Sequence, residues 1–379
     1  MKKKYLFILP IICALVSCSN NSEITGVNYE LYDFTSKVEF HTQEQIDNYI
    51  TNFDKTLADT NGNYLEPYAS RLLKEDMTLP LPVSLSWKAK AKGGSISSYQ
   101  IIVSEHEDLS SPFVGASKKQ TYDFYNAKVD TTYYWAIKVN RFISETHTFS
   151  TTSTKIRNVY VDGVNNVRDI GGYGSIKQGL IYRGAAFESY DKNSKKVETN
   201  ITKKGISTLK NQLGIKTEVD LRRNDDDHEN CDLTKSTVSG LTYVALPMQY
   251  GGKNILTEDD EYHNPAKIKA FFELLANENN YPVYFHCSQG KDRTGCLAYL
   301  LEALMGEETN DLYLDYIFSS FSAYKNKMSR NGIDQYYGKT LDNYKDESYS
   351  LSEKVYSYLN EVIGISTETI NSVKSIIAA

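Results

Sequence analysis

The chain has 379 residues, a hydrophobic fraction of 40% and a formal net charge of −6 at pH 7. This length exceeds one average domain and fits two domains with sizeable cores. The acidic balance argues against nucleic acid as a partner and against a polybasic membrane patch.

The amino terminus has the pattern of an export signal. Three lysines precede an apolar run from Tyr5 to Val16, which is too short to span a bilayer permanently. The segment Leu15 to Cys18 resembles the lipobox of bacterial lipoproteins, so residues 1–17 are predicted to be a signal peptide and Cys18 to be lipidated. Loss of those residues changes the formal charge to −6 − 3 = −9. We expect an exported lipoprotein on a bacterial cell membrane, with the inner or outer membrane left open.

The remaining cysteines suggest neither a disulfide framework nor a metal site. After Cys13 and Cys18 the chain has Cys231, Cys287 and Cys296, an odd number that raises the question of a reactive thiol. His228 with Cys231, and His286 with Cys287, lack the paired spacing of zinc ligands. No metal and no cofactor are expected.

Residues 18–78 are predicted to be a tether and a lead-in. The polar segment after Cys18 has no periodicity, and the stretch EQIDNYITNFDKTLAD has helical character. The sequence does not predict how this part packs.

Residues 79–154 have the pattern of an all-β sandwich. Alternating runs such as VSLSW, SYQIIVS and TTYYWAIKV are separated by turn residues, which is typical of small antiparallel sandwiches. Trp87, Tyr133, Tyr134 and Trp135 are expected to fill the core. The stretch resembles a fibronectin type III or immunoglobulin-like module, and its partner is left open.

Residues 155–379 show strands that alternate with helices. TEVDLR at 217–222, LTYVALPM at 241–248 and PVYFH at 282–286 are predicted strands. This alternation predicts an α/β domain with a mainly parallel central sheet flanked by helices.

The helices between these strands are predicted from apolar spacing and end signals. They are a helix through Ile206, Leu209 and Leu213 that ends at Gly214; a helix from Asn264-Pro265 with Ile268, Phe271, Phe272 and Leu275 on one face; and a helix from Cys296 to Met305 that ends at Gly306.

The loop HCSQGKDRTG at 286–295 lies between a predicted strand and a predicted helix. Ligands of α/β folds bind at such turns. The backbone N–H groups from Ser288 to Arg293 can point at an anion, and Gly290 and Gly295 permit a tight turn. We expect a phosphate site whose substrate contacts come from Ser288, Gln289, Gly290, Lys291 and Thr294.

Cys287 has the surroundings of a nucleophile. Helix-terminal N–H groups, Arg293 and the Thr294 hydroxyl favour its thiolate. The thiolate would attack phosphorus and form a phosphocysteine, which water hydrolyses. Arg293 can bind the phosphate as a planar fork, and His286 is expected to orient the loop.

The leaving group needs a proton donor. Asp292 is the first choice because the loop itself fixes its position. Asp220, Asp259 and Asp260 are competing candidates, and Asp220 is otherwise assigned a supporting role. Lys291 would hold extra negative charge on the substrate.

The loop resembles the HCxxGxxR phosphate-binding loop of cysteine-dependent protein tyrosine phosphatases. Its GKDRTG ending is similar to bacterial tyrosine and lipid phosphatases such as the secreted mycobacterial and listerial enzymes. The segments VNNVRDIGGY, KQGLIYRGA, TEVDLRR and DYIFSSF extend the resemblance over about 160–379. The resemblance implies a cysteine-phosphatase fold, with Cys287 as nucleophile, Arg293 as phosphate ligand and Lys291 and Asp292 as catalytic participants. It also implies that the loop aspartate replaces a mobile acid loop.

Some positions depart from the family pattern or remain open. Ser288-Gln289 and Gly184-Ala185 differ from the residues common there, which leaves the substrate open. Two interpretations are kept for Arg168, Asp169 and Arg183: they line the pocket, or they form an ion-pair network that braces the Gly171-Gly172 turn.

The expected function is a phosphatase for phosphorylated proteins, with phosphotyrosine as substrate. Lys291 adds phosphoinositides as a second substrate class. The alternatives are a phosphatase of small inositol or sugar phosphates, and a non-enzymatic surface protein that binds phosphate and acts through its sandwich.

Overall fold

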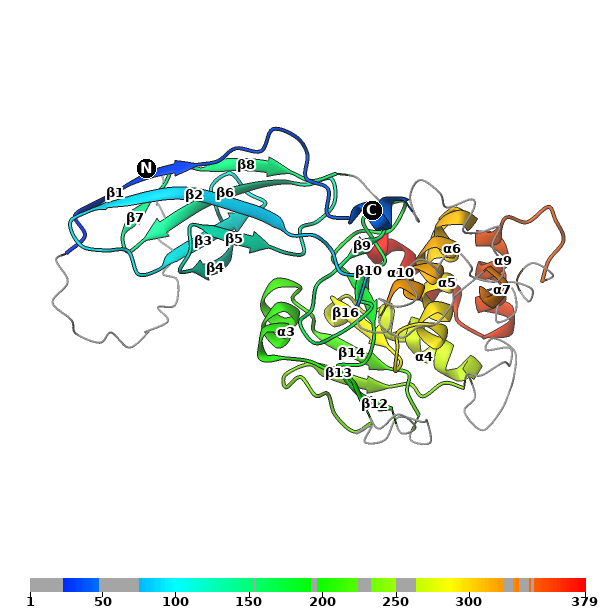
Figure 1. The fold of residues 1–379 in the computed structure, drawn as a ribbon. Coiled ribbons are helices and arrows are strands. Elements are labelled where there is room, and N and C mark those ends of the chain that lie inside the picture. The colour runs from blue at the N-terminus through cyan, green and yellow to red at the C-terminus, as the bar shows by residue number, and fades with distance from the viewer. Residues whose placement is uncertain are drawn as a thin grey trace, which may run out of the picture.

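A computed structural model describes residues 23–47, 75–152, 155–191, 196–223, 233–249, 264–322, 330–333, 341 and 344–379. It shows two units side by side, an elongated β-sandwich and an α/β unit (Figure 1). The predicted lipidation site Cys18 lies outside the described residues, as do His228, Cys231, Asp259 and Asp260.

The sandwich consists of two antiparallel sheets. One has the order β1-β2-β5, and the other has the order β4-β3-β6-β7 with β8 also paired to β6. The strands are β1 (Gly26–Leu31), β2 (Val83–Lys92), β3 (Tyr99–Ser104), β4 (Phe113–Ser117), β5 (Thr121–Phe124), β6 (Thr132–Val139), β7 (Phe142–Ile143) and β8 (His147–Ser150).

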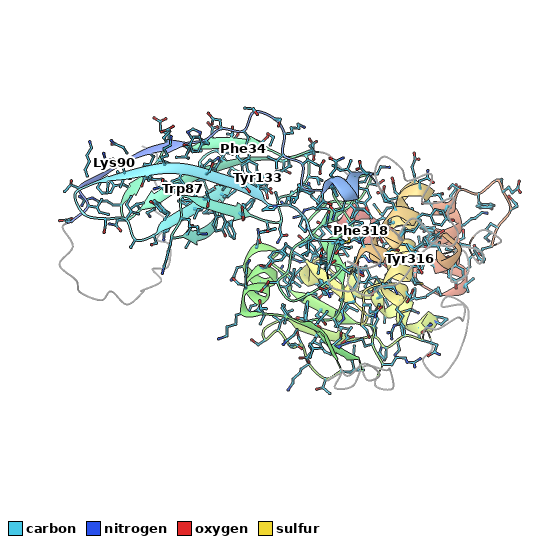
Figure 2. The ribbon with its side chains drawn as sticks, in the orientation of Figure 1. Phe34, Trp87, Lys90, Tyr133, Tyr316 and Phe318 are labelled. Atoms are coloured by element: carbon cyan, nitrogen blue, oxygen red, sulfur yellow. The ribbon has the colours of Figure 1, made fainter. Side chains whose placement is uncertain are left out.

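The sandwich core is aromatic, as the alternating pattern predicts. Trp87, Tyr133 and Trp135 are buried, and Figure 2 shows Trp87 and Tyr133 within the sandwich. Tyr134 is an exception to the prediction, because it is only half-buried. Neighbouring residues of a strand point to opposite faces, so Tyr133 and Trp135 fill the core while Tyr134 lies on the outer face.

The sandwich begins earlier than the predicted boundary at residue 79. Strand β1 lies within the predicted lead-in, yet it pairs with β2 along its whole length. Leu31 is part of the buried core, and the ring centroid of Phe34 lies 5.4 Å from that of Phe149. The predicted start is therefore corrected, because this strand completes one of the two sheets.

The α/β unit is built on a sheet of six strands in the order β15-β14-β16-β11-β10-β9. Its strands are β9 (Arg157–Asn158), β10 (Arg168–Asp169), β11 (Ile181–Gly184), β14 (Thr217–Asp220), β15 (Thr242–Ala245) and β16 (Val283–His286). Strands β15, β14, β16 and β11 run parallel, whereas β10 and β9 pair antiparallel at one edge. The sheet is therefore mixed, and its parallel part carries the predicted loop. A separate ribbon pairs β12 (Glu188–Asp191) with β13 (Lys196–Asn200).

Both faces of the sheet are buried. Val283 and Phe285 of β16 belong to one apolar cluster, and Tyr284 belongs to another. Burial on both faces is typical of parallel sheets flanked by helices.

The described helices agree with the predicted ones in position. Gly214, with φ of 66°, follows the helical segment that contains Leu209, and the α4 face is buried as expected. Helix α5 begins at Asp292, four residues before the predicted start, so the end of the loop forms its first turn. The helices are α1 (Gln43–Gln45), α3 (Lys203–Ser207) continued by η3 (Thr208–Gln212), α4 (Asn264–Leu275), η4 (Glu278–Asn280), α5 (Asp292–Met305), α6 (Thr309–Phe318) continued by η5 (Ser319–Phe321), α7 (Arg330–Ile333), α9 (Leu351–Ser357) continued by η7 (Tyr358–Val362), and α10 (Thr367–Ile377).

The two units are joined by polar contacts around Arg157. This buried side chain donates to the carbonyls of Ala127 at 3.2 Å and Asn126 at 2.8 Å, and to Asp169 at 2.5 Å. In the described ranges, no helix combines the length and apolar character needed to cross a bilayer.

Candidate active site

The loop HCSQGKDRTG connects β16 to α5 at the carboxyl end of a central parallel strand. Strand β16 lies between β14 and β11, and both of these neighbours run parallel to it. The loop therefore opens at the sheet edge where α/β folds bind ligands. This position is the one that the sequence predicts.

Two glycines allow the loop to approach β11 closely. Gly290 has φ of 68°, and a Cβ there would lie 2.2 Å from the carbonyl carbon of Gly184. A Cβ at Gly184 would lie 2.3 Å from the hydroxyl of Tyr284, which donates to the carbonyl of Ala185 at 2.6 Å. The departure from the family pattern at Gly184 thus has a steric reason, since a side chain would displace Tyr284.

Cys287 is buried at the start of the loop and is poised to ionise. Burial raises the pKa of its thiol, but the Arg293 guanidinium and the nearby Thr294 outweigh this effect. The negative charge of Asp292 opposes them in part. The resulting pKa of Cys287 lies below its ordinary value, as expected for a nucleophilic cysteine.

Arg293 is buried beside this thiol. Its Nη1 donates to the carbonyl of Leu221 at 3.2 Å and to that of Met248 at 3.4 Å. These carbonyls follow β14 and β15, so the two strands hold the guanidinium next to the loop.

The other predicted loop residues lie around the same turn. Lys291 is buried and its Nζ donates to Oε1 of Gln289 at 3.4 Å. Ser288 is 3% exposed, and its hydroxyl has no hydrogen-bond partner within the described part of the chain. Asp292 is partly exposed and accepts a hydrogen bond from the Tyr316 hydroxyl at 3.3 Å. Figure 2 shows Tyr316 on α6.

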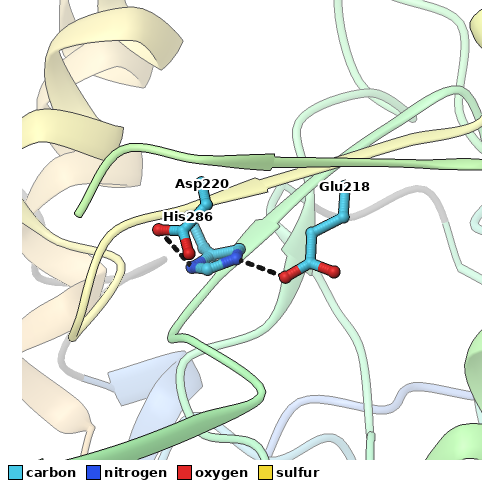
Figure 3. Close-up of side chains that lie close together, drawn as sticks. All are labelled: Glu218, Asp220 and His286. Carbon is cyan, nitrogen blue, oxygen red and sulfur yellow. Dashed lines mark hydrogen bonds and ion pairs between the residues drawn. The ribbon is translucent and has the colours of Figure 1, made fainter. Parts of the chain in front are cut away.

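His286 lies between two carboxylates of β14. Its Nε2 is 2.9 Å from Oε1 of Glu218, and its Nδ1 is 3.8 Å from Oδ1 of Asp220 (Figure 3). Burial lowers the pKa of His286, but Asp220 and Glu218 outweigh burial and raise it. Since Nδ1 also lies 3.1 Å from the carbonyl of Cys287, the histidine links the nucleophile to β14.

Asp220 is buried and paired with Arg222. Arg222 Nη2 donates to Oδ2 at 2.7 Å, and the Tyr243 hydroxyl donates to the same oxygen at 3.0 Å. Burial raises the pKa of Asp220, but the charges of His286 and Arg222 bring it down to about 2. A carboxyl with that pKa carries no proton near neutral pH, which suits a supporting role and argues against Asp220 as the acid.

Glu218, Asp220 and His286 are also the kind of side chains that bind metal ions, and their ligand atoms lie within 4.8 Å of one another. The hydrogen bond between His286 and Glu218, and those from Arg222 to Asp220, already engage these side chains. The cluster therefore has the geometry of a buried ion-pair network.

Arg168, Asp169 and Arg183 are buried and paired with opposite charges. Asp169 braces the predicted turn by accepting from the N–H of Gly171 at 2.9 Å. Arg168 and Arg183 instead share Asp315 of α6 as counter-ion. These contacts support the ion-pair interpretation, and among the described residues Asp169 is the one of the three that contacts the turn.

Sequence reasoning assigned no role to four residues near the loop: Asn166, Glu218, Asp315 and Tyr316. All four lie in segments quoted for the family resemblance, and Glu218 lies in the strand segment TEVDLRR. A polar residue within an otherwise buried strand is the signal that could have identified Glu218.

Part of the chain is similar to known phosphatases. The model of the tyrosine phosphatase family matches residues 159–378. A tyrosine-protein phosphatase from Nostoc commune is 28% identical over 122 residues, which cover 28% of this chain and 41% of that protein. The chain thus spans less than half of the length of this relative.

Two solved structures are also similar. The core catalytic domain of the PP-IP phosphatase SIW14 from S. cerevisiae has a TM-score of 0.31 and 18% identity, covering 50% of this chain and 91% of that one. TpbA from P. aeruginosa has a TM-score of 0.30 and 17% identity, and the match covers 48% of this chain and 88% of TpbA.

Proposed function

The chain belongs to the tyrosine phosphatase family, and from this premise we propose that it hydrolyses phosphate monoesters through a phosphocysteine intermediate. The observation that carries the proposal is the buried thiol of Cys287, whose pKa is lowered by Arg293 and Thr294 beside the start of α5. A thiol that ionises more readily than an ordinary cysteine depends less on a general base when it attacks phosphorus.

The reaction has two steps. In the first, the Cys287 sulfur forms a bond to phosphorus, the bond from phosphorus to the ester oxygen breaks, and Asp292 gives the leaving oxygen its proton. In the second step, the oxygen of a water molecule attacks phosphorus while Asp292 takes a proton from that water. The sulfur–phosphorus bond then breaks and frees the thiolate of Cys287. Arg293 and the loop N–H groups bind the phosphate oxygens in both steps.

The proposed substrates are phosphotyrosine in proteins and, as a second class, phosphoinositides. The buried Lys291 supports the second class, because a fixed cation in the loop favours substrates with additional phosphate groups. Comparison of catalytic efficiency on a phosphotyrosine peptide, a phosphoinositide and small inositol or sugar phosphates separates these possibilities.

The decisive test uses residues 19–379, which include every residue that the structure describes. We expect turnover of a phosphotyrosine peptide that is lost in Cys287→Ser. Cys296→Ala is the matched control, because Cys296 is a second buried thiol on α5 whose pKa is raised by burial; this variant should keep activity. Equal activity of the wild type and Cys287→Ser would contradict the proposal. Tight phosphopeptide binding without turnover would instead support the non-enzymatic alternative.

A second test addresses Asp292 as the acid. Asp292→Asn should reduce the rate most for substrates with poor leaving groups, because only these need a proton on departure. An equal reduction for good and poor leaving groups would assign the proton to another residue.

Export and lipid anchoring at Cys18 are proposed from the sequence of residues 1–18. Cys18→Ser should move the protein from the membrane fraction to the soluble fraction of cells. Unchanged partition between the fractions would contradict the anchor.

A further inference from the structure

The phosphate loop is held from outside by two buried side chains. Asn166 Nδ2 donates to the carbonyl of Gln289 at 3.0 Å and to that of Gly290 at 3.3 Å. Arg183 Nη2 donates to the carbonyl of Gly290 at 2.9 Å and to that of Lys291 at 3.3 Å. Three successive carbonyls of the loop therefore point toward Asn166 and Arg183.

This contact fixes the direction of the loop N–H groups. In a planar trans peptide, the carbonyl and the following N–H point in opposite directions. The N–H groups of Gly290, Lys291 and Asp292 are therefore turned away from Asn166 and Arg183. Convergent backbone N–H groups of this kind are what an oxyanion needs.

Asp315 of α6 orients both side chains. It is the counter-ion of Arg183, and its Oδ1 accepts from Arg168 Nε at 2.6 Å. Arg168 Nη1 in turn donates to Oδ1 of Asn166 at 2.7 Å. Because the amide oxygen faces Arg168, the amide nitrogen of Asn166 faces the loop.

The lead-in also reaches this network. The N–H of Asn166 donates to Oδ2 of Asp76 at 3.0 Å, and the N–H of Met77 donates to the carbonyl of Phe321 at 2.8 Å. Asp76 lies outside residues 159–378, which match the family. A segment that precedes the family region thus contributes to the surroundings of the loop.

Stability alone does not account for burying these charges. A buried ion pair costs desolvation energy, and apolar residues of similar volume often stabilise a protein as well or better. Unlike apolar residues, the guanidinium of Arg183 and the amide of Asn166 provide directional hydrogen-bond donors for the loop carbonyls.

We propose that Asn166, Arg183 and Asp315 are positioning residues that hold the phosphate loop in its oxyanion-binding shape before substrate arrives. The proposal rests on the proposed function, since it concerns the same site. None of the three is assigned a contact with the reacting atoms.

The experiment compares Arg183→Lys with Arg157→Lys in the purified full chain. Arg157 is a matched control, because it is equally buried, pairs with a carboxylate and donates to two backbone carbonyls, yet it contacts neither the loop nor Asp315 in the described structure. Lysine keeps the charge in both variants and removes the fork. The readouts are the dissociation constant for tungstate, an oxyanion probe, and kcat/KM for a phosphotyrosine peptide.

We expect Arg183→Lys to weaken tungstate binding and to lower kcat/KM by about a hundredfold, as misplacement of binding groups does. Arg157→Lys should leave both values unchanged. Wild-type affinity in Arg183→Lys, or an equal loss in Arg157→Lys, overturns the proposal. If the wild type binds tungstate but does not turn over the peptide, the proposed function is refuted. The positioning role is still tested in that case, because the tungstate affinities of the variants can be compared.

A second variant tests the proposal if Arg183→Lys does not fold. Asn166 has φ of 60°, a conformation that glycine adopts without strain, so Asn166→Gly removes the amide and keeps the backbone. Folded Asn166→Gly protein should bind tungstate more weakly than the wild type, and unchanged affinity overturns the proposal.

Discussion

In the sandwich the large buried side chains are tryptophan, tyrosine and phenylalanine, whereas around the phosphate loop they include arginine and aspartate. Trp87 and Trp135 lie in the sandwich core, while Arg168 and Arg183 are fully buried around Asp315. Apolar burial stabilises a fold without fixing the direction of any group. Buried charges cost desolvation energy but orient their partners. The two regions therefore differ in what burial achieves: one secures a shape, and the other aligns a loop.

The largest effect is expected where one carboxylate serves two buried arginines. Asp315→Ala should lower the free energy of unfolding of the α/β unit by about 5 kcal/mol, because removal of one partner leaves buried charge unpaired. Urea unfolding followed by far-UV circular dichroism, which reports the helices of this unit, measures the change.

Asp311→Ala is the control for this change. Asp311 lies one turn earlier on α6, and its partner Lys155 is half exposed, so its loss should cost about 1 kcal/mol or less. Equal losses in the two variants would show that the Asp315 network is no more costly to break than a peripheral pair.

A slightly smaller effect is expected in the sandwich core. Trp135→Ala removes a side chain with no exposed surface and should cost about 4 kcal/mol, because it leaves a cavity. Both tryptophans of the chain lie in the sandwich, so fluorescence of the remaining Trp87 reports unfolding of this unit. Folded Trp135→Ala protein should keep its kcat/KM. A tenfold loss of kcat/KM would show that the sandwich does more than secure its own shape.

The sandwich and the Asp315 network also differ in how far the sequence predicts them. The sandwich strands and the phosphate loop are contiguous patterns, so alternation and spacing reveal them. Strand β1 escaped prediction because most of the lead-in separates it from its partner β2. The Asp315 network escaped for the same reason on a larger scale: Asn166 lies 123 positions from Gln289, and Arg168 lies 147 positions from Asp315. Which residues pair over such separations is determined by the fold. The local sequence shows only that a polar residue lies in an apolar segment, and it does not show which residue is its partner.

The acid sensitivity of the molecule should originate in the α/β unit. The folded pKa of Asp220 is about 2, below its ordinary value of 3.8. Its carboxylate therefore adds stability that is fully present above about pH 4 and is lost as the pH falls toward 2. The shift corresponds to about 2 kcal/mol. In Asp220→Asn, the free energy of unfolding should decline less between about pH 5 and about pH 2 than in the wild type. Parallel curves for the two proteins would place the acid-sensitive group elsewhere.

The smallest effect separates two kinds of buried polar atom that have no hydrogen-bond partner in the described residues. The indole nitrogens of Trp87 and Trp135 are unpartnered in the sandwich, and so is the Ser288 hydroxyl in the loop. A large ring tolerates an unpaired N–H because its apolar burial outweighs the cost, but a small hydroxyl has no such compensation. If the Ser288 hydroxyl bonds the phosphate, Ser288→Ala should weaken tungstate binding by about 1 kcal/mol. The variant should lose no thermal stability, because the hydroxyl has no hydrogen-bond partner among the described residues. A lower melting temperature with unchanged tungstate affinity would instead make Ser288 a structural residue of the loop.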